Sequence, residues 1–405
     1  MSRLDNTITL ATSTRYANPE QVGALLPDAY GDLRYGGEGG LMPCVYIDTV
    51  NFVHLCANHA VESIDYVHDR DGNLLGAGAD YVATISGNYE AQGTIAYVTV
   101  TWNVHPPIYW RGKGKLDGAT LITNPISAWE DFLETRAGWV AADFDSTKLE
   151  AARATCTAQG YTFAKWIGEE RLIKAWLNDW CADIFADHWL DRLDRLVVKV
   201  ETGSWNYERD IVAHVVATRD VVDGEDGVEM VADIENLVNF LRQYHLYHYR
   251  RMDYSSTISN ESAASEKIFG NRIRTANYPT VRSTTHLTAL ATVLLALFDG
   301  REPPKASLVT FRTHGMKYCH LTRGDIIGFS WDRGPARAGD YYRNHLLKIL
   351  NLEMSLPVGP IHVEALDTGV RMNADAYYDA DGGPDSGYFN ADYWFGGADD
   401  LSIKP

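Results

Sequence analysis

The sequence lacks the features that would assign it to a secreted, membrane-bound or disulfide-stabilised class. Its five cysteines are an odd number, lie far apart and form no Cys-x-x-Cys pair, so neither a disulfide framework nor a four-thiolate zinc site is expected. The first residues, MSRLDNTITLATSTRY, contain no basic region followed by an apolar stretch, and the longest apolar run, LATVLLALF, spans about half a membrane. We therefore expect synthesis in a reducing cytoplasm, no secretion signal and no membrane insertion.

Basic charge is also scarce. The chain has 36 Lys and Arg against 54 Asp and Glu, which gives a formal net charge of −18. Stable binding of nucleic acid requires clustered basic side chains that neutralise phosphates, and the short basic pairs of this sequence form no such stripe. The negative sign would instead suit a surface that DNA passes in transit without sticking.

Common motifs for catalysis and cofactor binding are absent as well. There is no His-Glu-x-x-His, glycine-rich phosphate loop or thioredoxin-like motif, and GFSWD around Ser330 lacks the second glycine of a nucleophile elbow. We expect no cofactor. One enzymatic alternative stays open, because 54 acids and eleven tryptophans offer many paired carboxylates that could hydrolyse glycosides.

Two stretches carry residues that often bind metals. HLCANH contains His54, Cys56 and His59, and imidazole and thiolate are good ligands for zinc or iron. On a strand, however, His54 and Cys56 share one face while His59 points the other way. We favour two β segments that join near 57–60, and we keep a metal-binding role as a weaker hypothesis. DRDGNLLGAGAD has the aspartates of a calcium loop but has Gly72 at the fourth position, which favours a hairpin turn.

The patterns along the chain predict an α+β fold that is rich in strands. Runs of β-branched and aromatic residues indicate strands after Pro43, and apolar residues three and four apart indicate helices after Pro125. The expected parts are an N-terminal arm and loop (1–40), a β domain (41–123), an α/β module (124–205), a β-rich module with an insertion (206–285), a second β domain (286–375) and an irregular tail (376–405).

Several elements can be placed more closely. We expect helices from Pro125 to Gly138, from 146 to 159, through ERLIKAWLNDWCADIFADHW and through the apolar run. Residues 160–163 read as a short strand between the second and third helices. QYHLYHYRR reads as an exposed or interfacial strand, and SSTISNESAAS as a turn.

Three separated segments carry a family resemblance. The first, WRGKGKLDGATLITNPISAWEDFLETRAG, has a strand with a G-x-x-x-x-G turn at Gly112 and Gly118, and then Asn124 and Pro125 at a helix start. The second, NLVNFLRQYHLYHYRR followed by ESAASEKIFGNRIRT, resembles paired strands and a Ser-x-x-x-x-Gly turn at Ser265 and Gly270. The third is an apolar helix, a Pro pair, a strand and LTRGDIIGFSW, with a tight turn at Gly324 and Asp325. In this order, over roughly 40–370, they resemble the central hub or tail-tip proteins of tailed bacteriophages.

The resemblance implies a structural virion protein at the phage tail tip. Its fold would consist of tail-tube-like β-barrel domains, including 286–375, with inserted small α/β modules such as the hub module at 124–205. The resemblance also implies a symmetric ring, with a trimer as the expected form, in which each subunit would present two different faces to its neighbours. Partners would be the tail tube or distal tail protein, other tail-tip or fibre proteins and the tape measure protein, with DNA passing through the ring.

The aromatic stretches are the expected interface anchors, and their residues are Tyr244, Tyr247, Tyr249, Tyr393 and Trp394. Two departures from the family stand out. Residues 1–40 are short for a complete first tube-like domain, and the insertion at 220–227 has no counterpart that we can name. No segment resembles the lysozyme or peptidase domains that are fused to some hubs, so another protein would have to cleave the cell wall. The alternative from a different class is a virion-associated cell-wall or glycan hydrolase.

Overall fold

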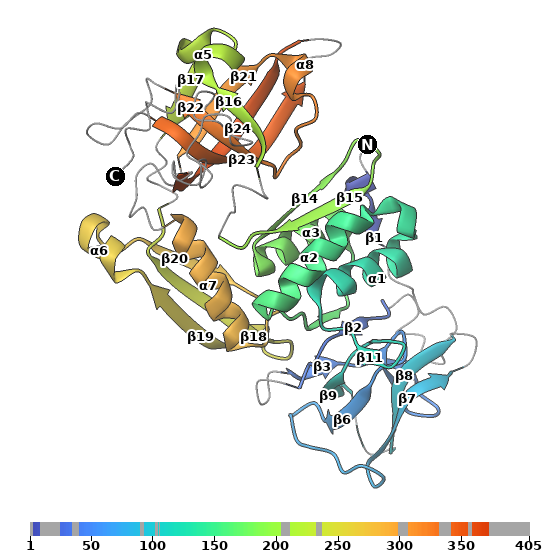
Figure 1. Ribbon diagram of the computed structural model, residues 1–405. Coiled ribbons are helices and arrows are strands. Elements are labelled where there is room, and N and C mark those ends of the chain that lie inside the picture. The colour runs from blue at the N-terminus through green and yellow to red at the C-terminus, as the bar shows by residue number, and fades with distance from the viewer. Residues whose placement is uncertain are drawn as a thin grey trace, which may run out of the picture. The chain divides into compact units, whose positions relative to one another are not determined.

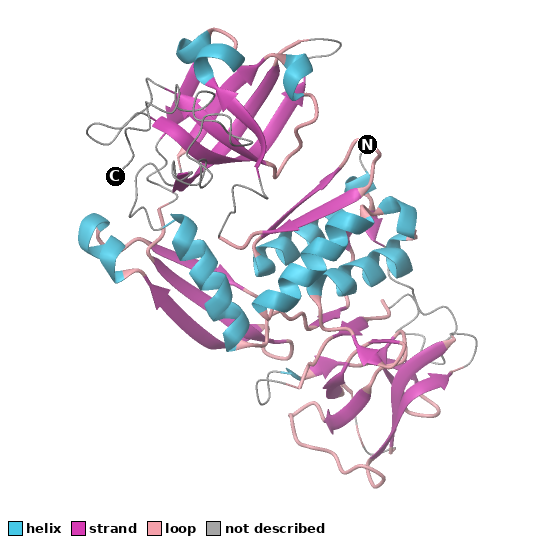
Figure 2. Ribbon diagram, viewed as in Figure 1, coloured by secondary structure: helices cyan, strands magenta, loops and turns pink. Residues whose placement is uncertain are grey.

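The computed structural model describes residues 3–8, 25–34, 40–89, 93–101, 104, 106–203, 211–231, 237–298, 307–331, 342–354 and 359–371. The chain divides into two compact units. Unit 1 comprises Met1–Glu201, Phe240–Glu261 and Ile273–Thr292, and unit 2 comprises Thr202–Asn239, Ser262–Arg272 and Val293–Pro405. The described residues form an α+β structure rich in strands, as the sequence predicts (Figures 1 and 2). None of the described helices has the length and apolar character that a membrane crossing requires.

The β module of unit 1 consists of two small sheets. One has the order β3-β9-β6 and the other the order β4-β5-β8-β7. Their strands are β3 (Met42–Pro43), β9 (Tyr109–Lys113), β6 (Ser63–His68), β4 (Val45–Asp48), β5 (Val53–Ala57), β8 (Thr94–Val100) and β7 (Tyr81–Asn88). A core that includes Cys56, Val98 and Trp110 fills this module. The strands predicted in 41–123 are confirmed, and from Ala96 to Val100 alternate side chains of β8 are buried, as a half-buried strand requires.

Three helices form the helical module of unit 1, and these are α1 (Pro125–Ala137), α2 (Ser146–Gln159) and α3 (Ile173–Ile184). Asp145 caps α2, and Gly138 and Gly160 end α1 and α2 in the left-handed conformation. The helix predicted through ERLIKAWLNDWCADIFADHW is shorter in the structure. Phe185 adopts a left-handed conformation with φ 49° and ends α3 there. Residues 160–163 form no strand. The neighbouring strand is β12 (Lys165–Ile167), which pairs with β2 (Asp28–Tyr30).

A three-stranded sheet with the order β19-β18-β20 completes unit 1. It contains β18 (Phe240–His248), β19 (Asp253–Glu261) and β20 (Ile273–Asn277), beside helix α7 (Thr284–Phe298), which begins in unit 1 (Figure 1). The prediction of a strand at QYHLYHYRR is confirmed over β18. The expected turn in SSTISNESAAS is wrong, because these polar residues alternate between exposed and half-buried positions along β19.

Unit 2 contains a six-stranded sheet with the order β16-β22-β23-β24-β21-β17. Its strands are β16 (Ile211–Val216), β22 (Ile326–Trp331), β23 (Tyr342–Met354), β24 (Ile361–Arg371), β21 (Leu308–Thr313) and β17 (Val228–Val231). Among the described strands of this sheet, β16 pairs in parallel with β22, and the other neighbours pair antiparallel. A core that includes Val215, Phe311, Phe329 and Leu347 covers one face of the sheet. The sheet therefore combines strands from both of the expected parts 206–285 and 286–375, and the boundary at 285 does not separate them.

The remaining elements are short. They are η1 (Arg3–Asp5), β1 (Thr7–Ile8), β10 (Leu116–Asp117), β11 (Thr120–Leu121), η4 (Ala141–Asp143), β13 (Arg171–Leu172), β14 (Ala186–Leu190), β15 (Leu196–Val200), α5 (Ala217–Asp220), η5 (Gly224–Gly227), α6 (Ala263–Phe269) and α8 (Gly315–Tyr318). The insertion at 220–227 thus forms the end of α5 and the turn η5, between β16 and β17 of the six-stranded sheet.

Candidate functional site

The first motif occupies positions where the backbone requires its residue types. Gly112 lies on β9, where a Cβ atom would be 2.1 Å from the carbonyl oxygen of Ser63. Gly118 has φ 57° in the turn that joins β10 to β11. Asn124 caps α1, because its side-chain oxygen accepts a hydrogen bond from the Ile126 amide at 3.0 Å. Pro125 is the first residue of that helix, where its missing N–H costs nothing.

The two glycines of this motif should differ in their tolerance of a side chain. We expect Gly112→Ala to lower the free energy of unfolding by about 1–3 kcal/mol through overpacking against the β6 backbone. Gly118→Ala should cost about 1 kcal/mol, because the turn is open and only the left-handed φ disfavours alanine. Urea unfolding of both variants checks this order, and a larger loss for Gly118→Ala would contradict it.

The second motif is held together by a residue that the sequence reasoning missed. Asn239 donates from its side-chain nitrogen to the carbonyl oxygen of Gly270 at 2.8 Å and to the hydroxyl of Ser265 at 3.3 Å. Its side-chain oxygen accepts from the Arg272 amide at 2.7 Å. Ser265 is buried on α6, and Gly270 ends that helix with φ 68°. The expected Ser-x-x-x-x-Gly turn is therefore a short helix, closed by an asparagine that a local pattern could not single out.

The third motif forms the tight turn before β22. Gly324 has φ 82°, and its amide donates to the carbonyl oxygen of Ile349 at 2.8 Å. The Asp325 carboxylate accepts from the Thr322 amide at 2.7 Å and from the Thr322 hydroxyl at 3.1 Å. The Asp325 contacts close the turn, and the Gly324 hydrogen bond attaches the start of β22 to its neighbour β23.

The predicted aromatic anchors of β18 lie close together. The ring of Tyr247 is 5.2 Å from that of Tyr249 and 5.2 Å from that of Tyr254, and Tyr244 is 6.3 Å from Tyr254. The Tyr249 hydroxyl accepts from the backbone amide of Trp166 at 2.9 Å. All four tyrosines are half-buried. Tyr393 and Trp394 lie outside the described residues.

Tyr244 lies on one particular face of its sheet. Its strand neighbours are Thr257 on β19 and Asn277 on β20, and both are exposed. The adjacent residue Gln243 points the other way, is fully buried and donates to the carbonyl oxygen of Leu287 on α7. The outer face of this sheet, which carries Tyr244, therefore faces away from α7.

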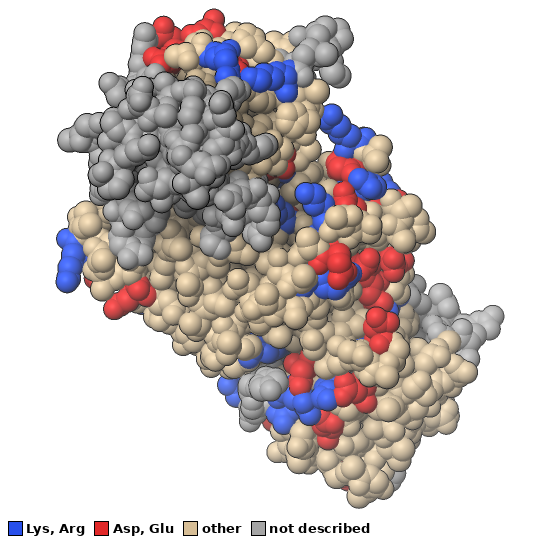
Figure 3. Space-filling view, viewed as in Figure 1, with Lys and Arg blue, Asp and Glu red and all other residues tan. Residues whose placement is uncertain are grey.

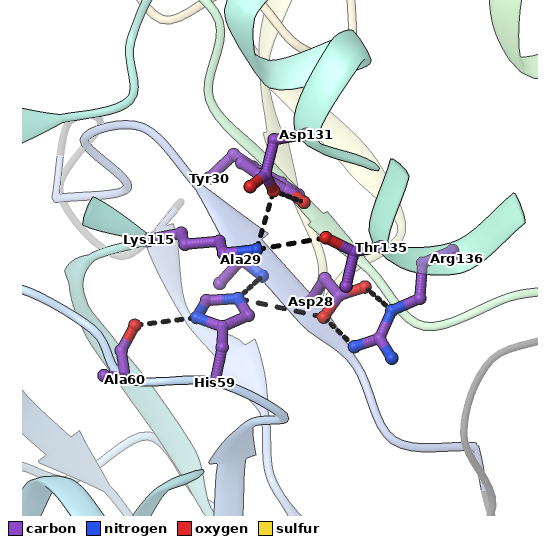
Figure 4. Close-up of polar contacts among 9 residues, drawn as sticks. All are labelled: Asp28, Ala29, Tyr30, His59, Ala60, Lys115, Asp131, Thr135 and Arg136. Carbon is purple, nitrogen blue, oxygen red and sulfur yellow. Dashed lines mark hydrogen bonds and ion pairs between the residues drawn. The ribbon is translucent and has the colours of Figure 1, made fainter. Parts of the chain in front are cut away.

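A buried polar network joins the helical module to the β module of unit 1 (Figure 4). The Arg136 guanidinium donates from two of its nitrogens to the Asp28 carboxylate. The side chain of Asp28 is 2% exposed and that of Arg136 is 9% exposed. Two residues farther along β2, the Tyr30 hydroxyl donates to Asp131 at 2.6 Å, and Asp131 also accepts from the Lys115 ammonium at 2.7 Å. The network thus connects α1, β2 and the residue before β10.

His59 extends this network to the bend between β5 and β6 (Figure 4). Its Nε2 accepts from the amide of Ala29 at 3.0 Å, so Nδ1 carries the proton and donates to the carbonyl oxygen of Ala60 at 2.8 Å. Burial lowers the pKa of His59, although the Asp28 carboxylate 3.9 Å away opposes this shift. His59 is therefore a neutral residue that fixes backbone geometry at the predicted bend.

The carboxylates of this network are poorly suited to glycoside hydrolysis. A glycosidase pair needs an acid that can hold a proton and a second carboxylate that can reach a sugar ring. Asp28 is buried and bound bidentately by Arg136, and Asp131 is bound by Lys115 and Tyr30. Both carboxylates are thereby neutralised by fixed partners, which indicates a structural role.

The residues of the HLCANH stretch have separate environments. The His54 ring is stacked on the Tyr46 ring at 4.3 Å, and burial lowers the pKa of His54 to about 3. The Cys56 sulfur lies 3.8 Å from that of Cys44, and His59 belongs to the network above. No group of three or more His, Cys, Asp or Glu that could hold a metal occurs within the ranges that the structure describes. The turn at 69–73 is closed by the Asp69 carboxylate, which accepts from the Asn73 amide at 2.8 Å.

Asp183 is a buried carboxyl group at the end of α3. The Thr280 hydroxyl donates to one carboxylate oxygen, and the other has no hydrogen-bond partner among the described residues. His286 of α7 donates from Nε2 to the Asp183 backbone carbonyl at 2.9 Å. Burial raises the pKa of Asp183 to about 7, although the Thr280 hydrogen bond opposes this shift.

This shift predicts a pH dependence of stability. The folded chain keeps the Asp183 proton up to a pKa of about 7, whereas the unfolded chain releases it near about 3.9. Between these values the free energy of unfolding should fall as pH rises, by at most about 1.4 kcal/mol per pH unit. Urea unfolding at several pH values should show that Asp183→Asn reduces this fall. Asp71→Asn, at a carboxylate that is 74% exposed, should leave it unchanged, and equal behaviour of the two variants would contradict the assignment.

A surface recess of about 720 Å³ lies on the β module. Its lining residues are Arg34, Ile64, Asp65, Tyr66 and Arg111. The Arg111 guanidinium lies 4.6 Å above the Tyr66 ring, and Arg34 donates to both carboxylate oxygens of Asp32. Arginine stacked on tyrosine is common in contact surfaces between proteins.

Among known proteins, the chain matches solved structures. No protein-family model matches the chain, and no curated protein matches it either. The tail protein from Neisseria meningitidis MC58 is 12% identical with a TM-score of 0.37, over 74% of this chain and 82% of that chain. The 43 kDa tail protein of prophage MuSo2 from Shewanella oneidensis is 9% identical with a TM-score of 0.35, over 90% and 93%. The prophage tail protein gp18 from Listeria monocytogenes EGD-e is 9% identical with a TM-score of 0.31, over 85% and 88%.

Proposed function

We propose that the chain is a structural protein of a phage tail, positioned as the hub of the tail tip or baseplate. The observation that carries the proposal is the order of three family motifs along the sequence, together with the place of each motif in the structure. Gly112 and Gly118, Ser265 and Gly270, and Gly324 all lie where a close backbone approach, a buried contact or a left-handed turn requires them. A shared backbone plan explains such residues better than a shared catalytic site.

The proposed hub would form a ring, with a trimer as the expected form, that connects the tail tube to the distal attachment apparatus. A ring subunit needs two different contact surfaces, and unit 1 offers two of suitable chemistry. One is the outer face of the β18 sheet with Tyr244, and the other is the recess with Arg111 and Tyr66. In the view of Figure 3, charged side chains are few over α7, whereas acidic ones gather near α1 and α2. Partners in this proposal are the tail tube or distal tail protein, tail-tip or fibre proteins and the tape measure protein, and DNA would pass in transit.

The location can be tested on phage particles. Antibodies against this chain, seen by negative-stain electron microscopy, should label the tail tip, and the purified chain should sediment as a closed oligomer. Absence of label from the tail together with a monomeric solution state would overturn the proposal. Turnover of peptidoglycan or another glycan, abolished by a single Asp or Glu substitution, would favour the hydrolase alternative.

The outer face of the β18 sheet can be tested separately. Tyr244→Lys places a charge beside exposed Thr257 and Asn277, away from the core, so the fold should survive while self-association weakens at least tenfold. Val82→Lys, on β7 where Val82 is 61% exposed, is the matched control and should not alter the oligomer. Analytical ultracentrifugation decides, and an unchanged mass for Tyr244→Lys would remove this face from the proposed interface.

A further inference from the structure

Two of the five free cysteines face each other across neighbouring segments. Cys44 lies between β3 and β4, and Cys56 lies on β5, with their sulfur atoms 3.8 Å apart. The pairing of Val45 with Leu55 places the two residues opposite each other in an antiparallel arrangement. Cys56 is fully buried, whereas Cys44 is half-buried.

We propose that Cys44 and Cys56 form a disulfide bond when the protein meets an oxidising environment. A disulfide needs a sulfur separation of about 2.05 Å, so the two sulfurs must approach by rotation about their Cα–Cβ bonds. Facing side chains on adjacent antiparallel segments can make such an approach without a change of register. Formation of this disulfide does not depend on the proposed tail-tip function. A phage particle that leaves a reducing cytoplasm would, however, meet such an oxidant outside the cell.

The reaction can use a low-molecular-weight disulfide such as oxidised glutathione. The half-buried Cys44 thiol loses its proton and attacks one sulfur of the oxidant, which forms a mixed disulfide. The other sulfur of the oxidant leaves as a thiolate and then takes up a proton. Cys56 then loses its proton and attacks the Cys44 sulfur, and the second reduced thiol leaves. In total, two protein thiols are oxidised to one disulfide while one small disulfide is reduced to two thiols. Burial, with Cys44 beside it, raises the pKa of Cys56 well above its usual value, so the second step should be slow.

The bond would lie where the chain passes from one sheet to the other. Cys44 donates its amide to the carbonyl oxygen of Ile108, beside β9 of the β3-β9-β6 sheet, whereas Cys56 belongs to the β4-β5-β8-β7 sheet. A bond between them would hold both sheets of the β module at this crossing. Closing the loop from 44 to 56 should also stabilise the fold by restricting the unfolded chain.

Peptide mapping of the full chain tests the proposal directly. The protein is incubated under native conditions with oxidised glutathione, quenched with acid, alkylated in denaturant and digested. We expect a peptide pair linked through Cys44 and Cys56, with the buried Cys156 and Cys181 alkylated and the exposed Cys319 either alkylated or carrying glutathione. Five alkylated cysteines after prolonged oxidation, or a bond between other cysteines, would overturn the proposal. Because the wild-type chain is used, this result does not depend on whether a variant folds.

Thermal unfolding supplies a second readout. The oxidised chain should melt several degrees above the reduced chain, and dithiothreitol should reverse the shift. Cys44→Ser should abolish the shift. Cys156→Ser, at a cysteine whose pKa burial raises to about 12, is the matched control and should retain it. An equal shift in Cys44→Ser and Cys156→Ser would contradict the assignment.

Discussion

Arg136→Met is expected to lower the free energy of unfolding by about 3–5 kcal/mol, because it leaves the Asp28 carboxylate buried without its cation. The methionine keeps much of the volume of the arginine side chain, so the loss reports the charge more than a cavity. Asp28 is 2% exposed, His59 is held neutral by its two hydrogen bonds, and the Lys115 ammonium is already bound to Asp131. No nearby side chain can therefore replace the guanidinium without rearrangement. Urea unfolding of the full chain at pH 7, followed by tryptophan fluorescence, measures the effect.

Two further variants separate the charge from the packing. The double variant Asp28→Leu with Arg136→Met removes both charges and should recover most of the loss, since buried ion pairs can often be replaced by apolar residues. Arg34→Met is the matched control, because Arg34 also binds an aspartate through two nitrogens but is 40% exposed. It should cost no more than about 1 kcal/mol. Similar losses at Arg34 and Arg136 would show that burial of the pair is not what matters.

The contrast between these arginines also shows which features can be predicted from sequence. Asn124 and Pro125 signal a helix start through residues that are adjacent in the chain, and the structure confirms this start. The ion pair of Asp28 and Arg136 joins residues 108 positions apart, and no local pattern distinguishes this arginine from the others. The role of Asn239 could not be predicted for the same reason. Its partners Gly270 and Arg272 lie about thirty residues away and come close to it only in the folded chain.

The incorrect element predictions have physical causes of the same kind. The apolar spacing of α3 continues past Phe185, but the chain turns there and 186–190 pair as strand β14 with β15. The polar residues of β19 looked like a turn, yet eight residues of β18 supply backbone partners for them. Likewise, β16 joins the six-stranded sheet through β22, more than a hundred residues later in the chain. Pairing between distant strands overrides local propensity in each case.

Trp180→Ala is expected to cost about 3–5 kcal/mol of unfolding free energy, because Trp180 lies in the middle of the aromatic core of the helical module. Its ring lies 5.3 Å from that of Trp176, and 5.4 Å from each of the rings of Phe132 and Phe163. Trp180 is 2% exposed. With the Trp129 ring 5.9 Å away, four rings on three separate segments surround Trp180, and they cannot all move inward, so alanine would leave a cavity that collapses only in part.

Trp180→Phe tests whether the loss comes from the cavity. The indole N–H of Trp180 is buried and has no hydrogen-bond partner among the described residues, so phenylalanine removes no hydrogen bond and leaves a smaller void. It should cost less than half as much as alanine. Trp189→Ala, at a half-buried tryptophan of β14, is the matched control and should cost less than Trp180→Ala. Equal losses for phenylalanine and alanine at 180 would mean that the indole itself, and not the filled volume, stabilises the module.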